Sequence, residues 1–238
     1  MKYAFISDIH GNTVALEAVL EDIEKQQVDK IVVLGDLCYR GPQPKKALEI
    51  VRSLNSDVIK GNADEWVVRG VQKGEVPDET LEIMNKEREW TLSQLNEGDV
   101  TFLKNLPHTI TLKAEDIHIF AFHATPDSLF DIILPNASDE IISEKMMSTD
   151  AQIVIYGHIH NPFIRSINGK IIMNIGSVGL PFDGLPKASY AIVEVESGNI
   201  RTTIERVAYN TEKTANLYHE VGYPNAEVLS SFVRNGKR

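Results

Sequence analysis

Short runs of apolar, mostly β-branched residues alternate with segments of helical periodicity in the first part of the chain. Apolar runs of this kind predict buried strands, and the segments of helical periodicity between them predict helices. The first such segment starts at Asn12, a residue that caps helices well. We expect strands over residues 2–7, 30–34 and 57–60, and helices over 12–25 and 44–53. This βαβαβ order predicts a parallel sheet.

Residues 77–105 lose the strand pattern and carry apolar side chains at helical spacing among charged ones. We expect a small helical cap here, inserted into a single domain that spans residues 1–238. The plain interpretation is that the cap covers one edge of the sheet. The alternative, based on its position in the chain, is that it borders the active site and selects substrates.

The second half of the chain returns to the strand pattern, with an Asn168-Gly169 turn that favours a hairpin. Strands are expected over 108–112, 117–122, 153–156, 163–167, 170–174, 189–196 and 200–208. The sequence therefore predicts a second sheet and an α/β fold. The tail over 211–234 is amphipathic and helical, with a break at 222–224, and either packs across the sheets or contacts a partner.

Side chains of the types that can bind a metal ion follow the predicted strands directly, at the point where each strand ends. They are Asp8, His10, Asp36, Asn62, His123, His158 and His160. Because α/β sheets place ligand sites at the carboxyl ends of their strands, these side chains can converge. Carboxylates and imidazoles suit a divalent ion that activates water, and Asp36 is placed to bridge two ions through its two oxygens.

Each of these motifs alone has an ordinary structural explanation, such as a loop, a helix cap or a hydrogen-bonded interior histidine. Together they favour a metal site, because four of the seven histidines fall at strand ends in order. We interpret His108, His118 and His219 as structural. Gly35, Gly61 and Gly157 precede donors, where we expect them to let the backbone turn sharply.

Composition and charge narrow the function. With 42% hydrophobic and 24% charged residues the chain is of ordinary globular composition, and its net charge of −10 argues against binding a nucleic-acid polymer. A small anionic substrate is still compatible, because bound cations make the site locally positive. The single cysteine, Cys38, excludes an internal disulfide, and no apolar run is long enough to span a membrane. A cytoplasmic location is the simplest expectation.

The motifs Asp8-Ile9-His10, Gly35-Asp36, Gly61-Asn62, His123 and Gly157-His158-Ile159-His160 resemble those of the calcineurin-like metallophosphoesterase superfamily. The stretch over 174–190 is similar to its bacterial phosphodiesterase and diadenosine-tetraphosphatase-like branch. The resemblance implies a four-layer α/β/β/α sandwich and a dinuclear centre. It implies that Asp8, His10 and His160 hold one ion, that Asn62, His123 and His158 hold the other, and that Asp36 bridges them.

Two positions depart from the phosphatase pattern. Ala63 stands where a histidine usually follows the asparagine, and Tyr39 stands where protein phosphatases have an aspartate before Arg40. The leading hypothesis is hydrolysis of a phosphodiester or phosphoanhydride of a small, nucleotide-type substrate by a hydroxide that bridges the metals, with no protein nucleophile. Asn12, Arg40 and Asn62 are the candidate contacts to the substrate phosphate. Manganese is the expected metal, and iron, zinc or nickel also suit the donors.

Three alternatives stay open. Two lie within the same chemistry, a dinucleoside polyphosphate hydrolase and a Ser/Thr-type phosphatase. The third is of another class, a non-catalytic interaction scaffold with the same fold. We expect no membrane partner, and a homo-oligomer is left open.

Overall fold

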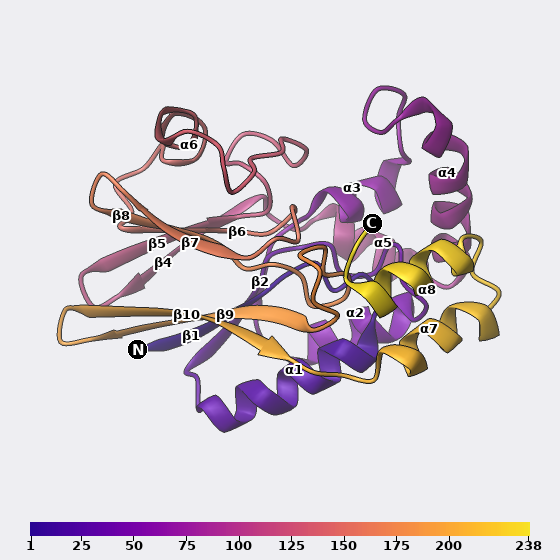
Figure 1. The fold of residues 1–238 in the computed structure, drawn as a ribbon, viewed down its shortest axis with the longest axis horizontal. Coiled ribbons are helices and arrows are strands. Elements are labelled where there is room, and N and C mark those ends of the chain that lie inside the picture. The colour runs from indigo at the N-terminus through magenta and orange to yellow at the C-terminus, as the bar shows by residue number, and fades with distance from the viewer.

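Two mixed sheets pack against each other in the computed structural model, which describes residues 1–238 (Figure 1). The first sheet has the strand order β10 (Asn199–Val207), β9 (Ala188–Glu196), β1 (Lys2–Ile6), β2 (Lys30–Val33) and β3 (Asp57–Val58). The second has the order β4 (Thr109–Ala114), β5 (Ile117–Phe122), β6 (Ile153–Tyr156), β8 (Lys170–Asn174) and β7 (Phe163–Ile167). In each sheet parallel pairs are extended by antiparallel ones.

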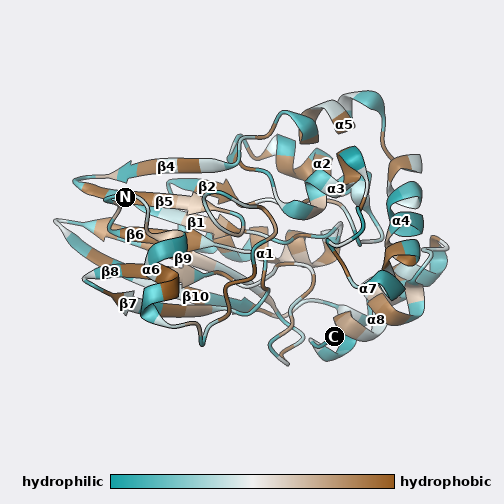
Figure 2. Cartoon of the chain, turned by 90° about the horizontal axis from the view of Figure 1, so that it is seen from above, coloured by the Kyte–Doolittle hydropathy of each residue, from teal (hydrophilic) through white to brown (hydrophobic).

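Eight helices complete the fold. They are α1 (Thr13–Gln26), α2 (Pro44–Ser53), α3 (Asn62–Arg69), α4 (Asp78–Ser93), α5 (Glu97–Lys104), α6 (Asp139–Met146), α7 (Thr211–Glu220) and α8 (Ala226–Asn235). In Figure 2 the helices α4 and α8 carry both hydrophilic and hydrophobic segments, as expected of helices that bury one face. No helix combines the length and the apolar composition needed to span a membrane.

The alternation of side chains along β1 shows how the layers are built. Tyr3 and Phe5 belong to the core between the two sheets, whereas Ala4 and Ile6 belong to the core beneath helices α1 and α2. This is the period of two that an extended strand imposes. On the far side of the second sheet, α6 packs on β5 and β6. The expected sandwich of two sheets between helical layers is therefore confirmed.

The predicted elements agree with the structure except at a few places. Residues 59 and 60 extend past β3, because the Lys60 amide donates to the carbonyl of Pro107 and leaves the sheet. The structure adds α3 and α6 to the expected helices. The segment 77–105 is helical, as α4 and α5, and Met84 and Leu103 from it join the same core as α1 and α2.

Candidate metal centre

All seven predicted donors lie at the carboxyl ends of strands. Asp8 and His10 follow β1, and Asp36 follows β2. Asn62 is the first residue of α3, just beyond β3. From the second sheet, His123 follows β5, and His158 and His160 follow β6. The two sheets bring these loops to one end of the sandwich, so that residues up to 152 positions apart in sequence become neighbours.

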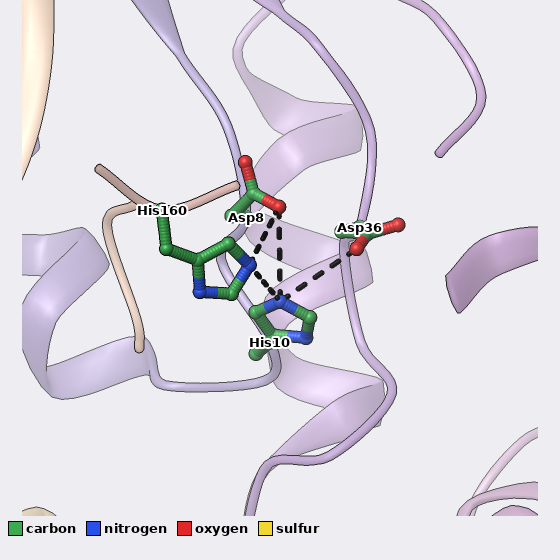
Figure 3. Close-up of side chains that lie close together, drawn as sticks. All are labelled: Asp8, His10, Asp36 and His160. Carbon is green, nitrogen blue, oxygen red and sulfur yellow. Dashed lines mark hydrogen bonds and ion pairs between the residues drawn. The ribbon is translucent and has the colours of Figure 1, made fainter. Parts of the chain in front are cut away.

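Four of the donors form one buried group, and their side chains point toward one another (Figure 3). The carboxylate Oδ1 of Asp8 lies 3.0 Å from Nε2 of His160, and the Nε2 atoms of His10 and His160 are 3.2 Å apart. Oδ2 of Asp36 lies 3.6 Å from Nε2 of His10. One ligand atom from each of the four residues falls within 4.8 Å of the others, which is compact enough for one cation.

The remaining three donors form a second group on the other side of Asp36. Oδ1 of Asn62 lies 2.9 Å from Nε2 of His123 and 2.8 Å from Nδ1 of His158. Oδ1 of Asp36 lies 3.5 Å from Nε2 of His123. Each oxygen of the Asp36 carboxylate thus faces a different group, which is the arrangement that a bridging carboxylate has.

Backbone carbonyls fix the orientation of three imidazoles. Nδ1 of His10 donates to the carbonyl of Tyr39 at 2.8 Å, Nδ1 of His123 to that of Leu34 at 2.7 Å, and Nδ1 of His160 to that of Leu180 at 2.5 Å. A carbonyl only accepts, so each Nδ1 carries a proton, and Nε2 is the ring atom directed into the site. Metal-binding histidines are commonly held this way.

The donor set fits a bound cation. The lone pairs of His10 and His160 face each other at 3.2 Å, and the buried Oδ1 of Asp8 has no hydrogen-bond partner. Such contacts are repulsive between neutral acceptors, and a buried unpaired acceptor costs free energy. A divalent cation among these atoms would turn both features into ligand bonds.

The pKa values follow from burial and from the two carboxylates. Burial lowers the pKa of His10 and of His158 to about 4, so both are neutral at pH 7. For His123 burial also acts to lower the pKa, but Asp36 and then Asp8 outweigh it and raise the pKa to about 10. Burial would raise the pKa of Asp8, but His160 and His123 lower it overall. Asp8 therefore stays ionised, as a metal ligand must.

The backbone at the site is strained. Five of the seven donors adopt positive φ, with values of 55° for Asp8, 47° for His10, 56° for Asp36, 68° for His158 and 55° for His160. Residues with side chains adopt this conformation rarely, at a cost of about 1 to 3 kcal/mol each, and such residues cluster at functional sites. The strain marks these loops as shaped for binding.

Asp64, the residue after Ala63, organises the loops that carry the donors. Its buried carboxylate accepts from the backbone amides of Asp36 at 2.8 Å, Leu37 at 2.9 Å and Gly61 at 2.9 Å. Burial, and then the charge of Asp36, raises the pKa of Asp64 to about 7. Asp64 thereby fixes the bridging Asp36 and the turn before Asn62, a role that the sequence pattern does not reveal.

The three residues predicted to contact the phosphate differ in their hydrogen bonds. Asn12 is buried, and its amide accepts from Ala15 N and Thr214 Oγ1 and donates to the carbonyl of Gly179. Asn12 therefore links α1 to α7, and its contact with a phosphate stays a prediction.

The phosphate contacts of Arg40 and Asn62 stay predictions. Nε of Arg40 donates to the buried Glu87 of α4 at 3.1 Å, while its terminal Nη atoms make no hydrogen bond. Asn62 lies within the second donor group. His108, His118 and His219 are exposed and lie outside both groups, as expected.

Three further residues shape the site through tertiary contacts. Nδ2 of Asn174 donates to the carbonyl of Gly157 at 2.5 Å, just before His158. Oγ of Ser177 donates to the carbonyl of Asp8 at 2.8 Å. The ring of Phe182 stacks on His160, with 4.5 Å between ring centroids and 8° between planes. The 174–190 motif noted in the sequence contains all three, and the structure gives it this supporting role.

Residues 1–198 match the model of the calcineurin-like phosphoesterase superfamily domain. The chain is 31% identical to an uncharacterised protein of Methanocaldococcus jannaschii over 231 residues, covering 88% of each. It is 25% identical to the Escherichia coli phosphodiesterase YfcE, covering 88% of this chain and 99% of that protein. A symmetrical bis(5'-nucleosyl)-tetraphosphatase of Baumannia cicadellinicola is 31% identical over 90 residues, covering 35% of this chain and 31% of that protein.

Among solved structures, a metallophosphoesterase of Sphaerobacter thermophilus superposes with a TM-score of 0.80 at 29% identity, covering 99% of both chains. The chain therefore belongs to the calcineurin-like phosphoesterase superfamily. Within that class it is a phosphoester hydrolase, with a cluster of side chains suited to divalent metal ions.

Proposed function

We propose that this protein is a dinuclear metal-dependent phosphoesterase that hydrolyses phosphodiester or phosphoanhydride bonds of a small, nucleotide-type substrate. The observation that supports it most directly is the Asp36 carboxylate, whose two oxygens face two separate donor groups. Asp8, His10 and His160 would complete one ion site, and Asn62, His123 and His158 the other. Manganese is the expected ion, and this donor set also suits iron, zinc or nickel.

Two bound ions would supply an activated water and neutralise the charge on the phosphate oxygens. The residues of the chain do the positioning. Carbonyl contacts keep the imidazole Nε2 atoms directed inward, and Asp64 fixes the backbone of Asp36. The unpaired Nη atoms of Arg40 would donate to a phosphate oxygen, in the two-pronged manner that guanidinium groups favour.

The side chain of Ala63 cannot protonate a leaving group. It is 1% exposed, and its backbone amide donates to Oδ1 of Asp36 at 2.7 Å. Substrates with good leaving groups should therefore react faster than simple alkyl esters. A series of aryl phosphodiesters of increasing leaving-group pKa should show a steep fall in kcat when chemistry limits the rate. A flat series would mean that another group supplies the proton.

The hydrolytic function is tested by comparing the manganese-loaded protein with Asp36→Asn on bis-p-nitrophenyl phosphate. We expect a loss of at least about a hundredfold, because the variant removes a charge from both ion sites. Asp116→Asn, an exposed carboxylate in the β4–β5 turn, is the matched control and should keep full activity. Equal rates for wild type and Asp36→Asn would leave only contaminating activity and refute the proposal.

The alternatives make different predictions in the same assay. A dinucleoside polyphosphate hydrolase, favoured by the partial similarity to the tetraphosphatase, would prefer diadenosine tetraphosphate over aryl diesters. A Ser/Thr-type phosphatase would prefer phosphopeptides. A non-catalytic scaffold would bind metal and hydrolyse none of them. A cytoplasmic location and any homo-oligomer are still predictions from the sequence.

A further inference from the structure

Arg238 is the one arginine in the protein without a polar partner. Each of the other eight donates a hydrogen bond to a carboxylate or to a backbone carbonyl. Arg238 makes neither a hydrogen bond nor an ion pair, and part of its surface is open to solvent. Its five N–H donors are therefore free to bind an anion.

Arg238 is nevertheless held in a defined place, with one aromatic ring between it and the candidate metal centre. Its Cζ lies 4.4 Å from the centroid of the Phe182 ring, and the same ring stacks on His160. Phe232 of α8 packs edge-on against Phe182, with 5.9 Å between centroids. A guanidinium group on an aromatic face is attracted by the ring quadrupole. One aromatic ring thus contacts both the cation and a proposed metal ligand.

The segment that carries Arg238 is fixed to the loop that carries Phe182. The amide of Gly184 donates to the carbonyl of Gly236 at 2.8 Å, and a Cβ on Gly236 would lie 2.7 Å from the Leu185 backbone. The loop is anchored in turn by Arg206, which pairs with Asp183 through both Nη atoms. This docking orders Arg238 before a ligand arrives, which lowers the entropic cost of binding.

The charges around Arg238 favour an anion. Desolvation, and then the positive charge of Arg40, lowers the pKa of Arg238. Arg40 is neutralised by Glu87, but no carboxylate pairs with Arg238. Of these two guanidinium groups, only that of Arg40 has a carboxylate partner. A bound anion would relieve this repulsion and gain charge-assisted hydrogen bonds.

We propose that Arg238 is a specificity residue that binds a second phosphate group of the substrate, next to the phosphoryl group held at the metal centre. The proposal rests on the proposed function, because that function places the first phosphate at the seven donors. It narrows the substrate class to compounds with two neighbouring phosphate groups, such as phosphoanhydrides. Arg40 and Arg238 would then bind successive phosphates of the same molecule.

The test is a calorimetric comparison of two probes on the manganese-loaded protein, orthophosphate and the non-hydrolysable methylenediphosphonate. Arg238→Gln should lower the affinity for methylenediphosphonate about tenfold and change the affinity for orthophosphate by less than twofold. Lys237→Gln, an exposed neighbour of equal charge, should change neither. Arg238→Lys should recover part of the lost affinity, because it restores the charge without the planar group.

Two results would overturn the proposal. One is unchanged binding of methylenediphosphonate by Arg238→Gln. The other is equally weakened binding of both probes, as expected if the substitution only loosens the Phe182 loop. A thermal melt of the same samples identifies such loosening as a lower midpoint. Failure of the proposed function gives a different result. The wild type would then hydrolyse no phosphoester, although it would still bind methylenediphosphonate with an affinity that depends on Arg238.

Discussion

Glycines beside the donors are required mainly because neighbouring atoms leave no room for a Cβ. Gly35 does turn through a positive φ of 87°, as the sequence predicts. Gly61 and Gly157 do not adopt a positive φ, and a different constraint applies to them. A Cβ on Gly61 would lie 2.1 Å from Oδ1 of Asp36, and one on Gly157 would lie 2.5 Å from Oδ2 of Asp8. The proposed ligands occupy the space that a side chain would need.

Gly157→Ala should therefore damage the site directly. The new methyl group would also meet Oγ of Ser7 at 2.3 Å, so Asp8 must move. We expect a destabilisation of about 1 to 3 kcal/mol and a metal affinity at least tenfold lower, measured by urea unfolding and by metal titration. Gly169→Ala, in the distant β7–β8 turn at φ 77°, should strain the backbone and leave metal binding unchanged. Equal metal affinity in both variants would contradict this account.

Asp64→Asn tests the network around Asp36. The variant turns one of the accepting oxygens into an amide donor that faces backbone N–H groups. Unfolding in urea should show a loss of about 3 kcal/mol, because buried donors lose their acceptor. Metal content after purification should also fall. If stability and metal content both match the wild type, the network does not position Asp36.

The residues that the sequence reveals and those that it hides differ in a physical way. Asp8, Asp36 and His158 are visible because each follows an apolar run, and the end of a strand predicts their position. Phe182 contacts His160, and Arg238 contacts Phe182. Both contacts join residues that are distant in sequence, and no local pattern encodes them. Asn12 shows a mixed case, since its helix-cap signal is confirmed and its phosphate contact stays a prediction.

At the scale of elements, prediction works where periodicity lasts and fails in short segments. The strand β6 and the helix α2 agree with the predicted ranges because apolar spacing and Pro44 define them. The helix α3 has only two turns, and its start is defined by Asp64, whose carboxylate accepts from the Gly61 amide. A cap of this kind stabilises a helix that its own apolar pattern is too short to indicate.

The end of α3 depends on Glu75, which gives the element a testable pH dependence. Glu75 accepts from Trp66 Nε1 at 2.9 Å and pairs with Arg69. Burial acts to raise the pKa of Glu75, but the hydrogen bond from Arg69 and those from the Gln72 amide and Trp66 lower it overall. A lowered pKa means that this contribution to stability is present above the unfolded-state pKa and is lost as the pH falls through the folded-state value.

Glu75→Gln should therefore be less stable than wild type by about 1 to 2 kcal/mol at pH 7, and the difference should shrink toward pH 3. Urea unfolding at several pH values measures it. Glu79→Gln, an exposed position without an ion pair, should differ little from wild type at any pH. A difference that grows as the pH falls would show the opposite sign and rule out this linkage.

At the scale of the whole molecule, the site exists only because two sheets meet. Asp8 and Asp36 come from the first sheet, His123 and His160 from the second, and no single element contains enough donors to bind an ion tightly. The order of strands therefore matters more for this site than any local motif does. Metal binding and the packing of the two sheets should be coupled for the same reason.

This coupling predicts that manganese stabilises the entire fold. Each ion that binds only the folded state at a hundred times its dissociation constant adds about 2.7 kcal/mol, which corresponds to roughly 5 to 10 °C in the melting midpoint of a chain this size. Calorimetry of chelator-treated and reloaded protein measures the shift. Asp36→Asn should show a much smaller rise, because both donor groups lose a shared charge. A wild-type midpoint unaffected by manganese would mean that the lone pairs of His10 and His160 are accommodated without a cation.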